Sequence, residues 1–181
     1  MSETNDHAGQ NYPGQDHPDQ DHPGQDHPGI IAPPPLIALG GVALGFLLDR
    51  VLPAYLLGTV LSPWVRGFVG GVLIASGAAV AIAAAARFRE AGTSVNPWTP
   101  SRQLATAGVF QLLRNPMYAG LLLLVGGIGV AFASDWTVVM VVPVALILHH
   151  GVVLREERYL EARFGDTYRR YKDRVARWGL F

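Results

Sequence analysis

The feature that most constrains this chain is a succession of long apolar stretches that carry almost no charge. The clearest covers residues 67–86, GFVGGVLIASGAAVAIAAAA, which contain no charged side chain. Three more cover residues 35–52, 117–134 and 136–154. A helix needs about 20 apolar residues to cross the hydrocarbon core of a bilayer. Because a chain of 181 residues cannot bury four such helices in a soluble core, the sequence predicts an all-α integral membrane bundle with about four transmembrane helices.

Composition narrows the chemistry that this bundle can carry. The chain contains no cysteine, which excludes disulfides, thiolate metal ligands and a cysteine nucleophile. Hydrophobic residues make up 50% of the chain and charged residues 15%, which is apolar for a soluble domain. The formal charge is balanced, with 14 basic and 14 acidic residues. We expect membrane lipids as partners, no nucleic acid and no resident metal.

Residues 1–34 differ in kind from the rest. They contain three near-copies of a five-residue unit, GQDHP, DQDHP and GQDHP, and lack the basic start and apolar core of a signal peptide. With a proline in every unit and few apolar side chains, nothing offsets the entropy of ordering. We therefore expect a disordered tail over 1–34 and a membrane domain over 35–181. The repeated histidines can bind a metal loosely or simply be part of a solvated tail.

The basic residues indicate an orientation. The loop 87–116 carries four arginines and the segment 155–181 carries eight lysines and arginines, whereas only Arg50 and Arg66 lie near the other side. Because bases collect on the cytoplasmic side of a membrane, we expect the loop, the C-terminal segment and both termini to be cytoplasmic. The expected location is the cell membrane, as a multi-pass protein of a bacterial inner membrane.

The cytoplasmic segment 155–181 is expected to form amphipathic helices, with Gly165 ending the first and Asp166 beginning the second. The second carries an apolar stripe at helical spacing, made of Tyr168, Tyr171, Val175 and Trp178. Basic residues, Arg177 among them, fill the remaining surface. Such a helix can lie against anionic head groups, or its stripe can pack on the protein.

Glycines and a short connection suggest how the spans pack. Only Asp135 separates the last two apolar stretches, which predicts a tight antiparallel hairpin of helices. Small residues at four-residue spacing allow helices to approach closely in lipid. Gly41 with Gly45, and Gly67 with Gly71, have this spacing. In a chain so rich in Gly and Ala the spacing can also be incidental.

Two polar clusters border the hairpin. Arg114, Asn115, Pro116 and Tyr118 stand where the third stretch begins, and the pair Glu156-Glu157 follows the fourth. Because the two spans have similar lengths, a chain that crosses and returns comes back to the same depth. The sequence therefore predicts a cation, an amide, a phenol and two carboxylates beside one another at the membrane edge, where ionisable groups are usually functional.

Each cluster also has an ordinary structural explanation. The first suits the N-terminus of a helix at a membrane interface. The second can be a solvated pair held by Arg155 and Arg158, although adjacent carboxylates repel each other unless a cation lies between them. His149 and His150, one turn earlier, are either interface residues or part of the same cavity lining.

Motifs in a fixed order add a resemblance to these observations. They are F..AGT at 88–93, P..P...L...G at 97–108, RNPMYAG at 114–120, EERYL at 156–160 and FG..Y..Y...V.RW at 164–178. In these motifs residues 35–181 resemble the bacterial membrane methyltransferases related to isoprenylcysteine carboxyl methyltransferase and phospholipid N-methyltransferases.

The resemblance implies S-adenosylmethionine as cofactor and a cytoplasmic site for it. The implied binding residues are Arg114, Asn115, Pro116, Tyr118, Gly120, Glu156 and Glu157. In this interpretation the arginine pairs with the cofactor carboxylate, the glutamates accept from its ammonium or ribose hydroxyls, and the phenol contacts the adenine or the methyl-sulfonium group. The implied reaction is methyl transfer to a lipophilic or membrane-associated nucleophile, as in isoprenylcysteine carboxyl methyltransferase. No catalytic residue is assigned, because a thiolate or carboxylate acceptor needs no base.

Three other functions stay open. The first is phospholipid amine N-methylation, although Ser76-Gly77-Ala78-Ala79 stands where eukaryotic enzymes of that type carry Gly-x-Gly. The second is an NADPH-dependent reductase, because membrane sterol reductases have a similar Arg-His/Asn-Pro-x-Tyr element but more helices than this chain. The third is a non-catalytic membrane scaffold that keeps the fold.

Overall fold

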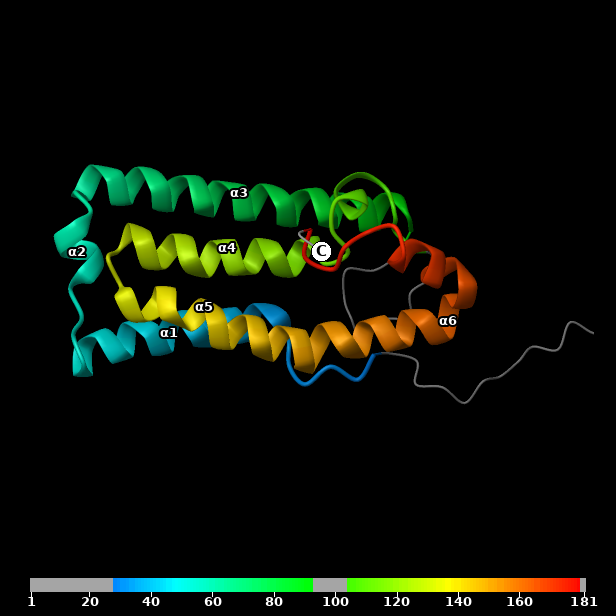
Figure 1. The fold of residues 1–181 in the computed structure, drawn as a ribbon, viewed down its shortest axis with the longest axis horizontal. Helices are drawn as coiled ribbons and strands as arrows, with labels where there is room; N and C mark the ends of the chain where they lie inside the picture. The colour runs from blue at the N-terminus through cyan, green and yellow to red at the C-terminus, as the bar shows by residue number, and fades with distance from the viewer. Residues whose placement is uncertain (1–27, 93–103, 180–181) are drawn as a thin grey trace, which may run out of the picture.

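A computed structural model describes residues 28–92 and 104–179 (Figure 1). The histidine repeats, and Thr93, Pro97 and Pro100 of the motifs, lie outside the described residues. Within them the chain is helical and contains no strand, which confirms the all-α prediction. The elements are α1 Pro34–Val51, α2 Leu56–Val60, α3 Pro63–Glu90, η1 Gly108–Gln111, α4 Pro116–Ala131, α5 Asp135–Leu148, η2 His149–Val153 and α6 Leu154–Lys172.

The long helices form an elongated bundle. Helix α3 packs along α4, α4 along α5, and α5 along α1, while the short α2 crosses one end (Figure 1). Within residues 28–92 and 104–179, three helices are long and apolar enough to cross a membrane: α1, α3 and the continuous helix Asp135–Lys172. The fourth expected span, α4, is a shorter apolar helix of 16 residues. The bundle therefore has three long candidate spans and one shorter apolar helix.

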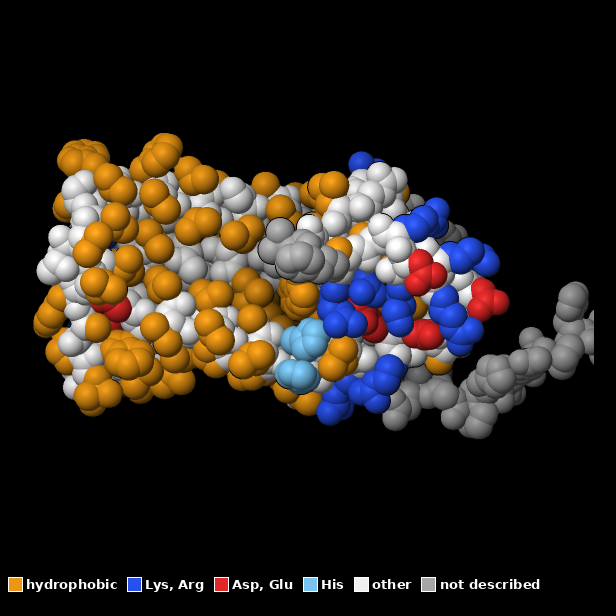
Figure 2. All heavy atoms as spheres, in the orientation of Figure 1, with side chains coloured by type: hydrophobic (Ala, Val, Ile, Leu, Met, Phe, Trp, Pro, Cys, Tyr) orange, Lys and Arg blue, Asp and Glu red, His pale blue; other side chains and the backbone are white. Residues whose placement is uncertain are grey.

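The outer surface agrees with a membrane location. Hydrophobic side chains cover most of the bundle, whereas charged side chains gather at the end formed by α6 (Figure 2). Large side chains such as Trp64, Phe68 and Ile82 point outward, and Trp64 is 88% exposed. Such a continuous apolar surface is stable only against lipid or another apolar surface. The protein is a membrane protein with an apolar shaft and one charged end.

The predicted hairpin of α4 and α5 is present, but its turn is not at Asp135. The connection is Phe132–Ser134, and Asp135 is the first residue of α5. The Ser134 hydroxyl accepts from the Thr137 backbone N–H at 3.2 Å, so Ser134 is the N-cap. A serine is a favoured N-cap because it satisfies an otherwise free N–H of the first helical turn.

Close contact between α3 and α4 depends on glycines that the sequence interpretation did not select. A Cβ on Gly77 would lie 2.6 Å from the carbonyl oxygen of Gly120, and a Cβ on Gly120 would lie 2.7 Å from that of Gly77. By contrast, nothing lies within 4 Å of a Cβ on Gly67 or Gly71, so for that pair the structure favours the second interpretation, that the spacing is incidental. Helix α3 turns a different face towards its partner.

In α1 the predicted glycine pair does face another helix. A Cβ on Gly41 would clash with Val144, and one on Gly45 would clash with Thr137. Both partners belong to α5. The four-residue glycine spacing therefore allows α1 and α5 to approach closely, as expected for small residues between membrane helices.

The folded part begins earlier than residue 35. Ile30 is buried in an apolar cluster with residues of α5 and η2, and the Ile31 N–H donates to the Gly151 carbonyl at 3.4 Å. The Arg155 guanidinium donates to the Gly29 carbonyl at 2.7 Å. Residues 29–31, which the sequence prediction assigned to the tail, therefore pack on the membrane domain, because apolar side chains return at Ile30.

At the charged end, α6 bends at Gly165, which has a φ of 50°. This matches the predicted helix end, since glycine adopts this left-handed conformation readily. Tyr168 and Tyr171 beyond the bend are buried, and the Tyr171 hydroxyl donates to the Phe110 carbonyl at 2.7 Å. This part of the stripe packs on the protein. The helix ends at Lys172, so the predicted extension to Trp178 was wrong.

Candidate functional site

The two polar clusters meet where α4 begins and α6 leaves the apolar shaft. The Tyr118 hydroxyl donates to Glu156 Oε1 at 2.6 Å, across 38 residues of sequence. Tyr118 lies in the first turn of α4, which starts at Pro116, and Glu156 lies in the first turn of α6. The antiparallel hairpin brings these turns to the same depth. The structure therefore confirms that the two clusters are in contact, as the sequence predicts.

Glu157 lies between two arginines. Its side chain is almost fully buried, at 7% exposure, and Arg114 Nη1 lies 3.2 Å from Glu157 Oε1. Arg177 holds both carboxylate oxygens, with Nε to Oε1 at 2.9 Å and Nη2 to Oε2 at 2.7 Å. This hydrogen bonding raises the pKa of the Arg177 guanidinium above its ordinary value. Glu157 is a buried acid with its charge compensated from two sides.

The ordinary explanation of the double glutamate does not hold in this structure. Arg155 donates to the Gly29 carbonyl, and Arg158 Nε donates to the Leu154 carbonyl of its own helix at 3.2 Å. Neither forms an ion pair with Glu156 or Glu157 among the described contacts. The cations that approach Glu157 come instead from the residue just before the N-cap of α4 and from the C-terminal residues.

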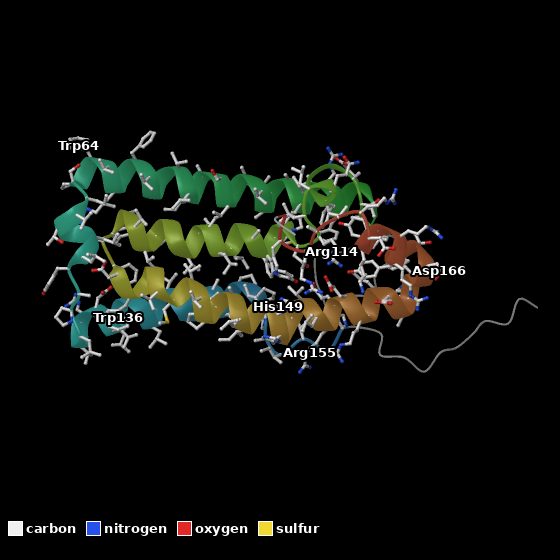
Figure 3. The ribbon with its side chains drawn as sticks, in the orientation of Figure 1. Trp64, Arg114, Trp136, His149, Arg155 and Asp166 are labelled. Carbon is white, nitrogen blue, oxygen red and sulfur yellow. The ribbon has the colours of Figure 1, made fainter. Side chains whose placement is uncertain are left out.

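Arg114 has hydrogen-bonding capacity to spare. Its side chain is 10% exposed, and its Nη1 is ion-paired with Glu157. Its Nε is buried without a hydrogen-bond acceptor. A buried N–H without an acceptor is costly, by about 1–3 kcal/mol. Arg114 therefore offers an unsatisfied donor beside Glu157, and an anionic ligand group would satisfy it. Figure 3 shows its position at the junction of α4 and α6.

The last described residues, 176–179, fold back over this cluster, and we call them the C-terminal clasp. The Arg114 N–H donates to the Ala176 carbonyl at 3.0 Å, and Asn115 Nδ2 donates to the Arg177 carbonyl at 3.4 Å. Asn115 is the N-cap residue of α4, but its side chain forms no cap hydrogen bond. Asn115 is buried and holds the clasp instead.

His149 and His150 belong to the region that borders the site. They lie in η2, a π-helical turn, and their rings are 4.8 Å apart. The His149 ring lies 6.3 Å from that of Trp178 in the clasp. Turns of π-helix occur frequently at functional sites. Of the two interpretations left open by the sequence, the contact with the clasp favours His149 as a residue at the edge of the site.

The structure separates the seven implied site residues into two groups. Five form the polar cluster: Arg114, Asn115, Tyr118, Glu156 and Glu157. Pro116 is buried as the first residue of α4, and Gly120 packs on α3. These two shape the helix that carries the cluster. No group of three or more His, Asp or Glu side chains in the described part of the chain is arranged to hold a metal ion.

Sequence reasoning missed Arg177, which it placed on the surface of a helix. The helix ends five residues before it, so the 3.6-residue period no longer applies there. Two signals pointed to it: the V.RW motif ends the series of matched motifs, and the paired acids required a cation. Neither signal shows by itself which of the eight C-terminal bases approaches them.

Comparison with known proteins identifies the family of the chain. Residues 65–167 match the phospholipid methyltransferase family, and the chain belongs to this family. The match covers nearly all of α3, all of α4 and α5, and most of α6, including Arg114 and both glutamates. The chain is also similar to an uncharacterized protein of Haemophilus influenzae, with 39% identity over 62 residues that cover 34% of this chain and 98% of that protein. No solved structure matches the chain.

Proposed function

We propose that this membrane methyltransferase transfers a methyl group from S-adenosylmethionine to a lipophilic or membrane-associated acceptor, at the junction of α4 and α6. The observation that carries the proposal is the unsatisfied buried Nε of Arg114 beside Glu157, next to the hydrogen bond between Tyr118 and Glu156. The family match supports methyl transfer. Family membership alone does not give the cofactor, so the fit of the site to it is the main support.

The donor set of the site suits this cofactor. S-adenosylmethionine carries a carboxylate, an ammonium, ribose hydroxyls and a sulfonium, and supplies the activated methyl group when bound. Arg114 would hold the carboxylate, because charged hydrogen bonds to guanidinium are strong. Glu156 would accept from the ammonium or a ribose hydroxyl, and Tyr118 fixes the orientation of Glu156. Asn115 holds the clasp that borders the site.

The chemical demand on the protein is then alignment and exclusion of water. Holding two reactants in line contributes up to roughly 7–11 kcal/mol to catalysis. The site lies where the charged end of the molecule meets the apolar shaft (Figure 2). An acceptor with an apolar tail can remain in the membrane while its polar head reaches this boundary. By the distribution of bases, we propose that this boundary faces the cytoplasm.

A second candidate acceptor is the amine of a phospholipid, which the description of the matched family favours. The first candidate acceptor is a carboxylate, as in isoprenylcysteine carboxyl methyltransferase. The two differ in the product, since a methyl ester is cleaved by mild base and an N-methyl group is not. Incubating membranes with the protein and methyl-labelled S-adenosylmethionine, followed by base treatment of the lipid fraction, distinguishes them.

The proposal is tested by calorimetric titration of the purified protein in micelles with S-adenosylmethionine and, separately, with NADPH. We expect binding of the first and none of the second. Glu156→Gln should weaken binding by about one to two orders of magnitude, since a hydrogen bond to a charged group contributes roughly 1.5–3 kcal/mol. Glu161→Gln is the matched control, because Glu161 lies on the same helix but pairs with Arg169 and Lys172. Binding of NADPH alone would favour the reductase, and binding of neither would favour the scaffold.

A further inference from the structure

The C-terminal clasp places a cation on one of the two acids of the proposed site. Arg177 donates to both oxygens of Glu157, at 2.9 and 2.7 Å, in a bidentate arrangement. Such pairs are the strongest hydrogen-bonded ion pairs in proteins. While Arg177 is in this position, Glu157 has little capacity left for a cation of a ligand. Glu156, in contrast, accepts only from the neutral Tyr118 hydroxyl among the described side-chain contacts.

The two arginines around Glu157 differ in exposure and in position along the chain. Arg114 is 10% exposed and directly precedes α4, whereas Arg177 is 30% exposed and follows the end of α6. The backbone of the clasp is tied down by hydrogen bonds to Arg114 and Asn115. The Arg177 side chain can therefore turn into solvent while the clasp stays in place. Moving Arg114 out would require exposing a largely buried guanidinium.

We propose that Arg177 is a built-in counter-ion of the site, which occupies Glu157 in the free protein and is displaced when a cationic ligand binds. The inference rests on the proposed function. The four charged groups Arg114, Arg177, Glu156 and Glu157 sum to a formal charge of zero when both acids are ionised. Removing Arg177 leaves one negative charge in excess. The site then attracts a cation more strongly.

The proposal predicts gains in affinity of different size for two related ligands. S-adenosylmethionine carries a sulfonium charge that S-adenosylhomocysteine lacks, so the excess negative charge favours the first ligand more. Arg177→Gln should bind S-adenosylmethionine about three- to tenfold more tightly than the wild type, the scale of one partly exposed charge interaction. The gain for S-adenosylhomocysteine should be clearly smaller. Both are measured by calorimetry in micelles.

Arg174→Gln is the matched control. Arg174 precedes the clasp by two residues, is exposed, and its Nε donates to the Arg170 carbonyl at 3.1 Å. The substitution changes the net charge by the same amount without removing a contact to Glu157. Its affinity for both ligands should remain within about twofold of the wild type. An equal gain in Arg174→Gln would overturn the proposal, because the effect would then be long-range.

A second measurement separates a counter-ion from a purely structural residue. In Arg177→Gln without ligand the melting temperature should fall, because Glu157 loses its bidentate partner, while the rise on adding S-adenosylmethionine should be larger than in the wild type. A structural residue would lower both. Wild-type binding together with unchanged or weaker binding by Arg177→Gln overturns this inference alone. Absence of binding by the wild type overturns the proposed function, and this inference with it.

Discussion

Both ends of the bundle bring acids and helix termini together, but they use the acids differently. At the end crossed by α2, Asp135 accepts from the backbone N–H groups of Leu56 and Leu57, at 2.8 and 2.9 Å. At the α6 end, Glu156 and Glu157 accept from a phenol and from guanidinium groups. In Figure 3 the label Trp136 marks the α2 end, and the label Arg114 marks the junction with the α6 end.

The acids of the α2 end complete local structure. Asp135 supplies acceptors at the start of α2, where N–H groups have no partner within the helix. Asp49 accepts from the Ser134 hydroxyl and from the Trp136 N–H, which joins α1 to the hairpin of α4 and α5. The Trp136 indole donates to the Leu52 carbonyl at 2.6 Å. Each contact fixes a helix end or a turn.

The α6 end shows a different pattern, because charged donors there exceed what the local structure needs. Arg114 Nε is buried without an acceptor, and Arg177 reaches Glu157 across 20 residues. Arg66 Nε at the α2 end is also buried without an acceptor, but of these two arginines only Arg114 lies beside an acid among the described ion pairs. A polar group whose partners are the N–H and hydroxyl groups of helix ends has a structural role. An unsatisfied buried donor beside paired acids indicates a binding role. The comparison predicts that damage at one end affects stability and damage at the other affects binding.

The largest expected difference between the two ends is in their accessibility to an impermeant reagent, because we propose that they lie on opposite sides of the membrane. Single cysteines at Thr59 and Asp166, both exposed, can be introduced into a chain that has none. In intact spheroplasts an impermeant maleimide should label Thr59→Cys and leave Asp166→Cys unlabelled until the cells are lysed. The reverse pattern would place the proposed site outside the cell.

The next effect is on ligand binding at the α6 end. Arg114→Ala should weaken the binding of S-adenosylmethionine about ten- to a hundredfold, because the carboxylate loses a charged partner in a poorly solvated place. Arg50→Ala, at the opposite end, removes the same charge and should leave the affinity within about twofold. Calorimetry decides, and an affinity of Arg114→Ala close to that of the wild type would remove the anion-binding role.

Stability should respond at the α2 end. Asp135→Asn weakens the acceptor at the start of α2 and should lower the unfolding free energy by about 0.5–2 kcal/mol, the usual range for a lost cap. The affinity for S-adenosylmethionine should be unchanged. Thermal unfolding in micelles measures the first quantity and titration the second. A loss of binding without a loss of stability would contradict the division between the ends.

A smaller effect is expected from the phenol. Tyr118→Phe removes the hydroxyl that orients Glu156 and keeps the ring. Losing one such hydrogen bond should weaken ligand binding by roughly three- to tenfold, corresponding to about 1 kcal/mol. Tyr55→Phe, at the exposed opposite end, is the control. If both variants bind like the wild type, the Tyr118 hydroxyl serves only the packing of α4 on α6.

The smallest effect should come from the repeat tail. Deleting residues 2–27 leaves the contacts of Gly29, Ile30 and Ile31 intact. Membrane insertion and the affinity for S-adenosylmethionine should stay within about twofold of the wild type. A deletion that continues through Ile31 should lower the melting temperature, since it uncovers the apolar cluster against η2. A strong effect of the shorter deletion would show that the tail takes part in binding.

Much of the fold was predictable because a bilayer leaves few choices. Apolar stretches of span length must be helices there, and a hairpin returns the chain to the depth at which it started. These two constraints were enough to place Tyr118 beside Glu156. The glycine contact between α3 and α4 was not predictable from spacing alone, because Gly67, Gly71 and Gly77 are all small and the rotation of the helix decides which of them meets a partner.

The site was predictable in its α4 and α6 parts and not in its C-terminal part. Helical periodicity describes residues as far as Lys172, and beyond it the chain turns back without a repeat to extrapolate. Arg177 and Ala176 reach the site through that turn. Contacts made by irregular backbone depend on tertiary packing, so local sequence carries little information about them.

The π-helical turn η2 has a consequence for the alignment of the whole charged end. Such a turn contains one residue more than an α-helical turn, and one residue corresponds to about 100° of rotation in an α-helix. The extra residue therefore rotates α6 about the helix axis relative to α5. This rotation decides which side chains of α6 face the site. Deleting one residue within His149–Val153 would restore an even helix. It would also rotate both glutamates away from α4 without altering a single side chain of the site.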